Sequence, residues 1–303
     1  MSARNTESAK NAPGAPRVNA ARRLLLLSVV RRVVQLSILG LFIGTARLGW
    51  TLLGEPLLSG DFSSSLFAGA LPLADPFAFL QKLCAGHAPE LAMTTGSLIV
   101  LAVYVIAGGR AFCGWVCPMN IVTDAAASLR GRLGIRSESL RIHRSVRYGV
   151  ALGALIASAV TGAAAFEWIS PQAFLWREAI WGIGMGFVAS VLGVFALDTL
   201  LVSRGWCGHL CPLGAFWSIV GRAGLIKPLF IDERCTRCAD CIKVCPEPQV
   251  INFKDAAARG MIASGECTSC GRCAAACPEN AIVFAPRFRA RPAGTPTPHS
   301  VKE

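Results

Sequence analysis

Four long apolar stretches constrain the fold of this 303-residue chain more than any other feature of its sequence. They run approximately over residues 33–53, 91–109, 148–166 and 179–202. Each approaches the roughly 20 apolar residues that an α-helix needs to cross a bilayer. Charges interrupt these stretches only near their ends, as Arg47 does in the first and Asp198 in the fourth. We therefore predict four transmembrane helices.

The composition supports a membrane protein rather than a soluble one. Apolar residues make up 53% of the chain and charged residues 16%, whereas a typical soluble domain has about 25% charged residues. The net charge of +12 would suit acidic lipid, a cytoplasmic membrane face or nucleic acid. The low charged fraction and the two tyrosines argue against nucleic acid.

Basic residues flanking the stretches predict the orientation, because cytoplasmic loops carry more Lys and Arg. Residues 1–32 hold seven basic residues against one acid, and the loop between the second and third stretches is rich in arginine. The loops after the first and third stretches hold more acids than bases. We expect both termini in the cytoplasm, and residues 54–90 and the turn near Glu167 on the other side of the membrane.

An export signal is the alternative interpretation of the N-terminal segment. Arg22-Arg23 before Leu24–Val30 has a faint likeness to a twin-arginine signal. Arg31-Arg32 end that apolar run after seven residues, and no clear cleavage site follows. The favoured interpretation is a basic amphipathic segment that leads into the first transmembrane helix.

Two matching cysteine motifs directly follow the second and fourth stretches. Residues 110–119 read RAFCGWVCPM and residues 204–213 read RGWCGHLCPL, an internal repeat with an offset of 94 residues. Cysteines four residues apart share one face of a helix. The pairs Cys113/Cys117 and Cys207/Cys211 together supply the four thiolates that an iron–sulfur cluster or a structural zinc ion takes.

We predict that these four cysteines form one unit near the cytoplasmic interface. This unit is a candidate third metal or redox site, in addition to the two clusters that the C-terminal cysteines predict. A third iron–sulfur cluster is the first candidate occupant, and a redox-active set of dithiols is the second. Arg110 and Arg204 occupy matching positions and would favour thiolates. The alternative is a packing motif, in which small thiols lie beside a proline that ends each helix.

Eight further cysteines occur in two copies of the pattern C-x2-C-x2-C-x3-C-P, 32 residues apart. In bacterial two-cluster ferredoxins with this spacing, the fourth cysteine of each run ligates the other cluster. We predict that one [4Fe–4S] cluster is held by Cys235, Cys238, Cys241 and Cys277, and the other by Cys245, Cys267, Cys270 and Cys273. Zinc is the alternative occupant, but paired zinc sites need neither a third cysteine in each C-x2-C run nor the proline that follows the last cysteine. Short strands are expected near residues 249–253, 261–262 and 281–284.

These features divide the chain into four parts. We expect a basic cytoplasmic segment at 1–32, a four-helix membrane domain at 33–227, a two-cluster ferredoxin domain at 228–286 and a disordered tail at 287–303. Residues 1–19 are also expected to be disordered. The predicted fold class is an α-helical membrane protein with a C-terminal α+β two-cluster bacterial ferredoxin-type domain.

Taken together, these motifs resemble the NapH family of ferredoxin-type membrane proteins. The similarity covers about residues 30–285 and extends beyond the cysteines to other short segments. These segments are DFSSSL from Asp61, PLADP from Pro72, RGWCGHLCP from Arg204 and CPEP from Cys245. The MauN family of methylamine utilisation shares the cysteine motifs and is a close rival.

The resemblance implies a bacterial inner-membrane, multi-pass subunit that oxidises ubiquinol or menaquinol and passes electrons towards periplasmic nitrate reductase. It would act as the quinol dehydrogenase component of an electron-transfer complex. Its partners would be the lipid bilayer, quinol, the periplasmic ferredoxin-type subunit NapG, the multihaem cytochrome NapC and the reductase. The residues alone indicate only a membrane-bound iron–sulfur electron carrier. A metal or cofactor assembly factor with the same cysteines is the alternative from another class.

Several ionisable residues outside the cysteine motifs are weaker candidates. Asp198 lies within a predicted span, where acids are commonly functional, so it is a candidate proton or quinol site, although an ion pair with Arg204 would also explain it. On the expected outer side, Asp75, Glu167 and His87 can accept protons, but the commoner role for each is that of a solvated loop residue.

Overall fold

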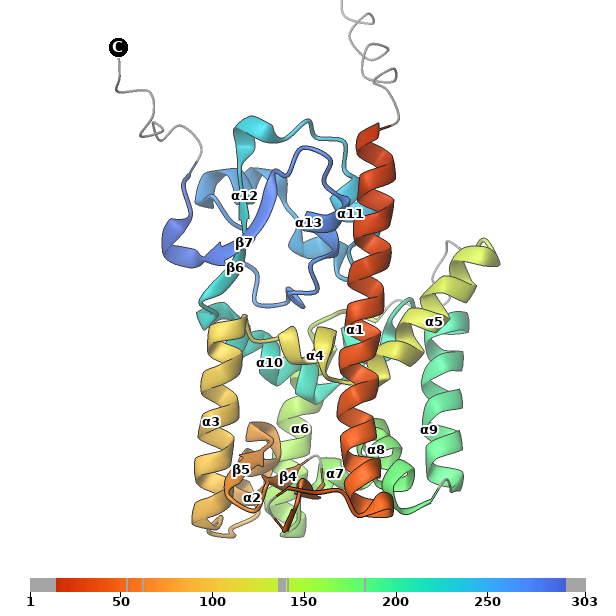
Figure 1. The fold of residues 1–303 in the computed structure, drawn as a ribbon, viewed down its shortest axis with the longest axis vertical. Coiled ribbons are helices and arrows are strands. Elements are labelled where there is room, and N and C mark those ends of the chain that lie inside the picture. The colour runs from red at the N-terminus through yellow and green to blue at the C-terminus, as the bar shows by residue number, and fades with distance from the viewer. Residues whose placement is uncertain are drawn as a thin grey trace, which may run out of the picture. The chain divides into compact units, whose positions relative to one another are not determined.

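The computed structural model describes residues 15–292, apart from 53, 62, 136–139, 141 and 183. Of the residues that were expected to be disordered, 1–14 and 293–303 lie outside the described range. The chain divides into two compact units (Figure 1). The helical unit comprises Arg31–Lys227 and Ala263–Cys270, and the ferredoxin unit comprises Pro228–Ile262 with the described parts of Met1–Val30 and Gly271–Glu303.

Helices occupy all four apolar stretches. They are α1 (Ala15–Leu48), α3 (Leu91–Ala107), α6 (Val146–Thr161) and α9 (Met185–Ala196), the last continued by a π-helical turn, η2 (Leu197–Leu201). The other helices of this unit are α2 (Pro76–Cys84), α4 (Ala111–Trp115), α5 (Met119–Arg132), α7 (Ala165–Ile169), α8 (Pro171–Trp181), the π-helical η3 (Trp206–Leu210) and α10 (Pro212–Ala223). In the fold, α10 packs against α3 and α6, while α9 packs against α5 and α8.

Several predicted boundaries differ from the structure, and the third stretch is one case, since its helix ends at Thr161 rather than at 166. Helix α1 continues without a break through Arg31 and Arg32, so the helix begins well before the apolar stretch expected from residue 33. It ends at Leu48 rather than near residue 53, because Gly49 adopts a left-handed φ of +67°. The fourth stretch is divided between two helices, because its first residues end α8 and Gly182 at φ +145° separates them from α9, which begins at Met185.

Helix α1 is the element of the described chain that is long and apolar enough to cross a membrane, over Ala20–Leu48. The helices Leu91–Ala107, Val146–Thr161 and Met185–Leu201 are apolar but shorter. Each of these three carries large apolar side chains on its surface. Leu98, Leu152 and Leu192 are 59%, 59% and 60% exposed.

The segment at 54–90 is folded rather than an open loop. After the short hairpin of β1 (Thr51–Leu52) and β2 (Glu55–Pro56), it forms an antiparallel sheet of β3 (Leu58–Gly60), β4 (Ser64–Phe67) and β5 (Leu71–Ala74). Helix α2 then begins behind Asp75, whose Oδ1 accepts a hydrogen bond from the backbone N–H of Phe77 at 3.0 Å. Asp75 is thus a helix cap and not a freely solvated residue.

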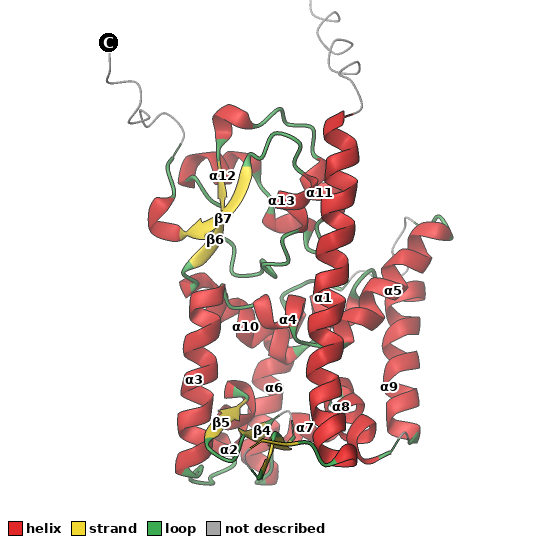
Figure 2. Cartoon of the chain, viewed as in Figure 1, coloured by secondary structure: helices red, strands yellow, loops and turns green. Residues whose placement is uncertain are grey.

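The ferredoxin unit pairs two strands beside short helices (Figure 2). Its elements are β6 (Ile226–Phe230), η4 (Asp232–Arg234), α11 (Asp240–Val244), η5 (Pro248–Val250), α12 (Phe253–Arg259), α13 (Arg272–Ala276), β7 (Ile282–Pro286) and η6 (Arg287–Arg289). The strand expected at 249–253 is wrong, because Asn252 caps α12 through its Oδ1, which accepts from the N–H of Lys254 at 3.0 Å. Met261 forms one bridge, with Leu229. Residues 287–289 form a 3₁₀ turn, so the tail is ordered at its start.

Gly109 marks a close approach between two parts of the helical unit. Its φ is +70°, and a Cβ there would lie 2.2 Å from the Cα of Gly221. We expect Gly109→Ala to lower the unfolding midpoint of the protein in detergent by several degrees, because a left-handed residue costs about 1–2 kcal/mol before any clash. Gly153→Ala is the control, since its Cβ meets nothing within 4 Å. An unchanged midpoint for Gly109→Ala would show that the approach is not tight.

Candidate iron–sulfur sites

The structure brings the four cysteines of the two CxxxCP motifs together in the core of the helical unit. Cys117 and Cys211 belong to the buried core cluster, and Cys113 and Cys207 pack against it. All four thiols lie within electrostatic range of one another. The predicted convergence of the two hairpins is therefore present in the fold, and their ligation of a common group stays a prediction.

Local helix geometry presents these thiols. Cys113 lies on α4, and Cys207 lies on the π-helical turn η3. Cys211 caps the N-terminus of α10, where its Sγ accepts a hydrogen bond from the N–H of Gly214 at 3.4 Å. Cys117 directly precedes Pro118, the residue before α5. In each motif the proline lies at the N-terminus of the next helix, where the fixed φ of proline is favourable.

The electrostatics of the group favour a bound cationic centre. Burial, and then the neighbouring thiols, raise the pKa of Cys117 and Cys207 well above the usual value for a thiol. The pKa of Cys211 rises to about 12 for the same reasons, although Arg110 opposes the shift. Metal binding would stabilise the four thiolates that burial alone disfavours.

The two arginines at matching positions have different partners. Arg110 is buried, and it donates hydrogen bonds to the backbone oxygens of Cys207 at 3.1 Å and Glu266 at 2.9 Å. Arg204 instead forms an ion pair with Asp124 at 2.7 Å. The structure therefore supports the expectation that Arg110 favours thiolates. Arg204 instead forms its ion pair with a carboxylate of α5.

Asp198 lies in η2 and is 1% exposed. Its Oδ1 accepts a hydrogen bond from the N–H of Trp206 at 3.0 Å, which joins η2 to the start of η3. The carboxylate lies within electrostatic range of Cys207. This geometry gives Asp198 a structural role beside the cysteine group, and its assignment as a proton or quinol site stays a prediction.

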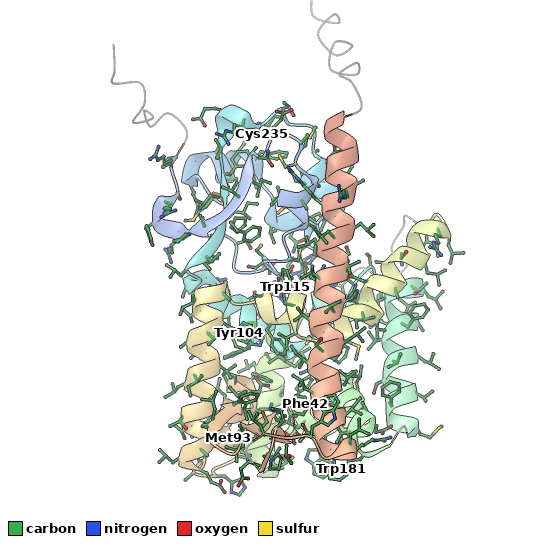
Figure 3. The ribbon with its side chains drawn as sticks, viewed as in Figure 1. Phe42, Met93, Tyr104, Trp115, Trp181 and Cys235 are labelled. Carbon is green, nitrogen blue, oxygen red and sulfur yellow. The ribbon has the colours of Figure 1, made fainter. Side chains whose placement is uncertain are left out.

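Four cysteines of the ferredoxin unit line one cavity. They are Cys235, Cys238, Cys241 and Cys277, the set predicted for the first cluster (Cys235 is labelled in Figure 3). Phe230, Phe253 and Ile282 complete much of its wall. Cys277 also accepts a hydrogen bond at its Sγ from the N–H of Ala281, at 3.2 Å. Four thiols around an apolar space, one with an N–H donor, fit the ligand chemistry of a [4Fe–4S] cluster.

The two ferredoxin motifs share the same local backbone. Arg237 and Ala239, on either side of the second cysteine of the first motif, have φ values of +57° and +62°. Ser269 and Gly271 occupy the same positions in the second motif and have φ values of +48° and +78°. A left-handed turn thus surrounds the second cysteine of each run. This turn would let three thiols of the run surround one corner of a cluster.

The cysteines predicted for the second cluster are divided between the units. Cys245 and Cys273 belong to the ferredoxin unit, and Cys267 and Cys270 to the helical unit. Burial raises the pKa of Cys267 to about 11, while Lys227 and Arg110 oppose the shift. The joint ligation of a cluster by these four residues stays a prediction.

Within residues 15–292 and outside the gaps given above, no three His, Cys, Asp or Glu side chains converge on one point that would hold a single metal ion. A [4Fe–4S] cluster spreads its four thiolates over four irons, so it needs wider spacing.

Comparison with known protein families assigns the class. A 4Fe-4S binding domain matches residues 91–136 and 183–230, the two segments that contain the CxxxCP motifs. A 4Fe-4S dicluster domain matches residues 227–278. The chain is therefore a ferredoxin-type iron–sulfur protein. No solved structure matches it.

Curated relatives assign the family. The chain is 44% identical to the methylamine utilization ferredoxin-type protein MauN of Methylorubrum extorquens, over 73% of this chain and 75% of the relative. It is 41% identical to the ferredoxin-type protein NapH of Escherichia coli, over 74% and 76%, and 42% identical to NapH of Haemophilus influenzae, over 73% and 75%. The chain belongs to the NapH/MauN family of ferredoxin-type electron-transfer proteins, which confirms the resemblance.

Proposed function

We propose that this chain is a four-span inner-membrane protein that oxidises quinol and passes the electrons through iron–sulfur clusters towards periplasmic nitrate reductase. NapG, NapC and the reductase are the proposed partners. The apolar surfaces of α1, α3, α6 and α9 support the four spans, because exposed side chains such as Leu98 and Leu152 suit lipid better than water. The excess of arginine before the first span and between the second and third supports cytoplasmic termini.

The observation that carries the electron-transfer proposal is the contact between the two kinds of cysteine motif within the helical unit. The segment Ala263–Cys270, which supplies Cys267 and Cys270, packs against the CxxxCP motifs there. Arg110 joins the backbone of Glu266 to that of Cys207, and the Trp115 Nε1–H donates to the backbone oxygen of Ser269 at 3.0 Å. These hydrogen bonds thereby join segments that carry ligands of the proposed third and second clusters. A bound [4Fe–4S] cluster supplies one-electron redox chemistry, and this contact would link two such carriers.

We expect quinol to reduce the clusters of the anaerobically purified full chain in lipid vesicles. The measurement is the electron paramagnetic resonance signal of reduced clusters after addition of ubiquinol or menaquinol. Dithionite gives the total reducible signal as the control. Signals that dithionite produces and neither quinol produces would contradict quinol oxidation and would favour the metal or cofactor assembly factor.

A role in methylamine utilisation is the second candidate, favoured by the 44% identity to MauN. Deletion of the gene separates the two roles. The nitrate proposal expects the rate of periplasmic nitrate reduction from quinol to fall. An unchanged nitrate rate with a loss of methylamine-dependent electron flow would establish the MauN role instead.

A further inference from the structure

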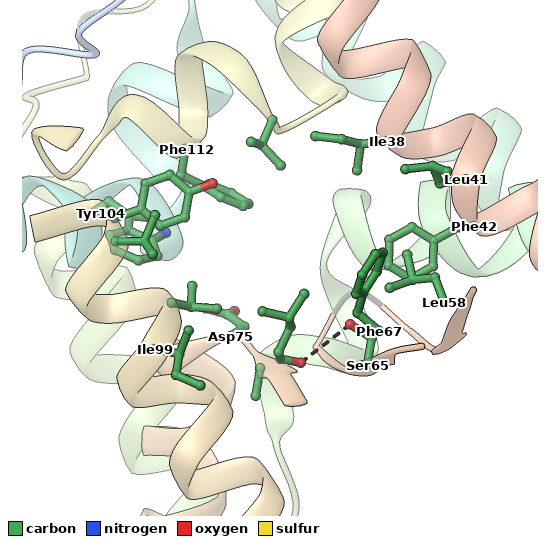
Figure 4. A pocket seen from close by; sticks show the side chains of 16 residues that line it. Ile38, Leu41, Phe42, Leu58, Ser65, Phe67, Asp75, Ile99, Tyr104 and Phe112 are labelled. Atoms are coloured by element: carbon green, nitrogen blue, oxygen red, sulfur yellow. Dashed lines mark hydrogen bonds between the residues drawn. The ribbon is translucent and has the colours of Figure 1, made fainter. Parts of the chain in front are cut away.

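A cavity of about 340 Å³ lies inside the helical unit, apart from the cysteines. Its walls come from α1, α3, α4, α10 and the sheet of β3, β4 and β5 (Figure 4). Ile38 and Phe42 of α1 lie across the cavity from Ile99 of α3. Its volume falls in the range of about 300–1,000 Å³ that is usual for small-molecule sites, and its walls are mainly apolar, as in such sites.

Polar groups lie at the two ends of this apolar space. Asp75 and Ser65 lie at the sheet end, and Tyr104 lies at the other end beside Phe112 (Figure 4). The Ser65 hydroxyl donates to the backbone oxygen of Leu73 at 3.5 Å. A flat ring with an oxygen at each end would therefore meet polar groups at both of its oxygens.

Trp217 is an unpartnered donor in the wall of the cavity. Its side chain is 1% exposed, and its Nε1 has no hydrogen-bond partner among the described residues. A buried donor without a partner costs about 1–3 kcal/mol. An acceptor oxygen bound in the cavity would remove that cost.

The end of the cavity at Tyr104 adjoins the CxxxCP thiols. The Tyr104 hydroxyl lies within electrostatic range of Cys113 and Cys117. Phe112 and Val116, which line the cavity, are the chain neighbours of those cysteines. A molecule bound here would contact residues that flank the four-thiol group.

One residue that lines the cavity is also exposed on the outer surface of the helices. Val103 lines the cavity and is 53% exposed. This surface lies on α3, one of the proposed membrane helices. An apolar molecule dissolved in lipid would therefore have access to the cavity from the bilayer.

Asp75 is suited to accept a proton at neutral pH. It is half-buried, and burial together with the nearby Glu167 carboxylate raises its pKa to about 7, although the N–H groups of α2 oppose the shift. Glu167 accepts a hydrogen bond from the Ser63 hydroxyl at 2.7 Å. It lines a second cavity, of about 270 Å³, which holds three further charged side chains (Asp61, Lys82 and Arg177). That cavity gives a proton on Asp75 a polar route outwards.

We propose that the apolar cavity binds the ring of a quinol and that Asp75 accepts the proton of the hydroxyl group at the sheet end. This assignment rests on the proposed quinol oxidation. The reaction converts quinol to quinone with loss of two protons and two electrons. Asp75 takes the proton at the sheet end and passes it to water on the outer side, and solvent water takes the proton of the other hydroxyl group. The two electrons would go to two bound [4Fe–4S] clusters in the oxidised state, one to each.

Photolabelling with an azidoquinone tests binding without turnover. In vesicles that contain the full chain, we expect the label on peptides of α1 and α3, and we expect Ile99→Trp, which fills the cavity, to reduce labelling at least tenfold. Leu98→Trp is the matched control, because Leu98 is the exposed neighbour outside the cavity. Labelling that is unaffected by Ile99→Trp, or that lies on other peptides, would overturn the assignment.

Asp75→Asn tests the proton step. Asparagine keeps the acceptor that caps α2, so we expect labelling to persist while quinol oxidation slows by about 100-fold. Because only the carboxylate accepts a proton, the wild-type rate should fall about tenfold per pH unit below 7, and Asp75→Asn should lose this slope. Glu90→Gln is the control and should keep both the rate and the slope, because Glu90 is exposed and lines neither cavity. An Asp75→Asn protein with wild-type rate and slope would refute the role of Asp75.

The two proposals fail in different ways. If the wild-type clusters are not reduced by quinol at all, the proposed function is wrong. If they are reduced, but neither Ile99→Trp nor Asp75→Asn alters labelling or rate, quinol oxidation stands and its site lies elsewhere.

Discussion

Replacement of Cys277 by serine should remove the cluster held by Cys235, Cys238 and Cys241, although Cys277 follows them by more than 30 residues. The four thiols line one cavity in the ferredoxin unit. Serine is a poor ligand for iron in such sites, so the protein should lose about four iron atoms per chain. The measurement is iron and acid-labile sulfide in anaerobically purified protein, together with its paramagnetic resonance spectrum.

A comparison of variants decides between crossed and sequential ligation without prior assignment of the spectra. In the crossed arrangement, Cys277→Ser and Cys241→Ser lose the same spectral signal, and Cys273→Ser loses a different one. Cys84→Ser is the matched control, because Cys84 is exposed and lies outside every motif. A Cys277→Ser spectrum that matches Cys273→Ser would show that each run holds its own cluster.

The sequence predicted those parts of the protein that depend on local pattern. Apolar length located the four helices, and cysteine spacing grouped the thiols that line the ferredoxin cavity. Repetition of the CxxxCP motif also predicted that its four thiols meet, because equivalent hairpins pack in equivalent ways. Spacing alone, however, did not reveal that Cys267 and Cys270 pack with the helical unit.

The cavity was beyond sequence analysis because its residues are scattered along the chain. Tyr104 and Trp217 come from separate helices, and nothing in their local sequence distinguishes them from core aromatics. Asp75 was noticed as an outer acid, but its cap to α2 and its place in an apolar wall depend on the fold of the segment at 54–90. The partner of Arg204 was missed for a similar reason, since Asp124 lies 80 residues away on α5.

The four thiols of the CxxxCP motifs should behave as one site. We expect Cys113→Ser and Cys207→Ser each to remove the same cluster signal and about four iron atoms per chain, because a cluster that loses one of its four ligands is seldom retained.

The double variant tests this unity directly. If one site holds all four thiols, Cys113→Ser with Cys207→Ser should lose no more iron than either single variant, since the first change has already emptied the site. Cys84→Ser again serves as the control for a cysteine outside the motifs. Separate losses that add in the double variant, or full iron content in both single variants, would show that the two pairs are independent. Electrons from the cavity beside Tyr104 would then need a route that does not pass through a shared four-thiol centre.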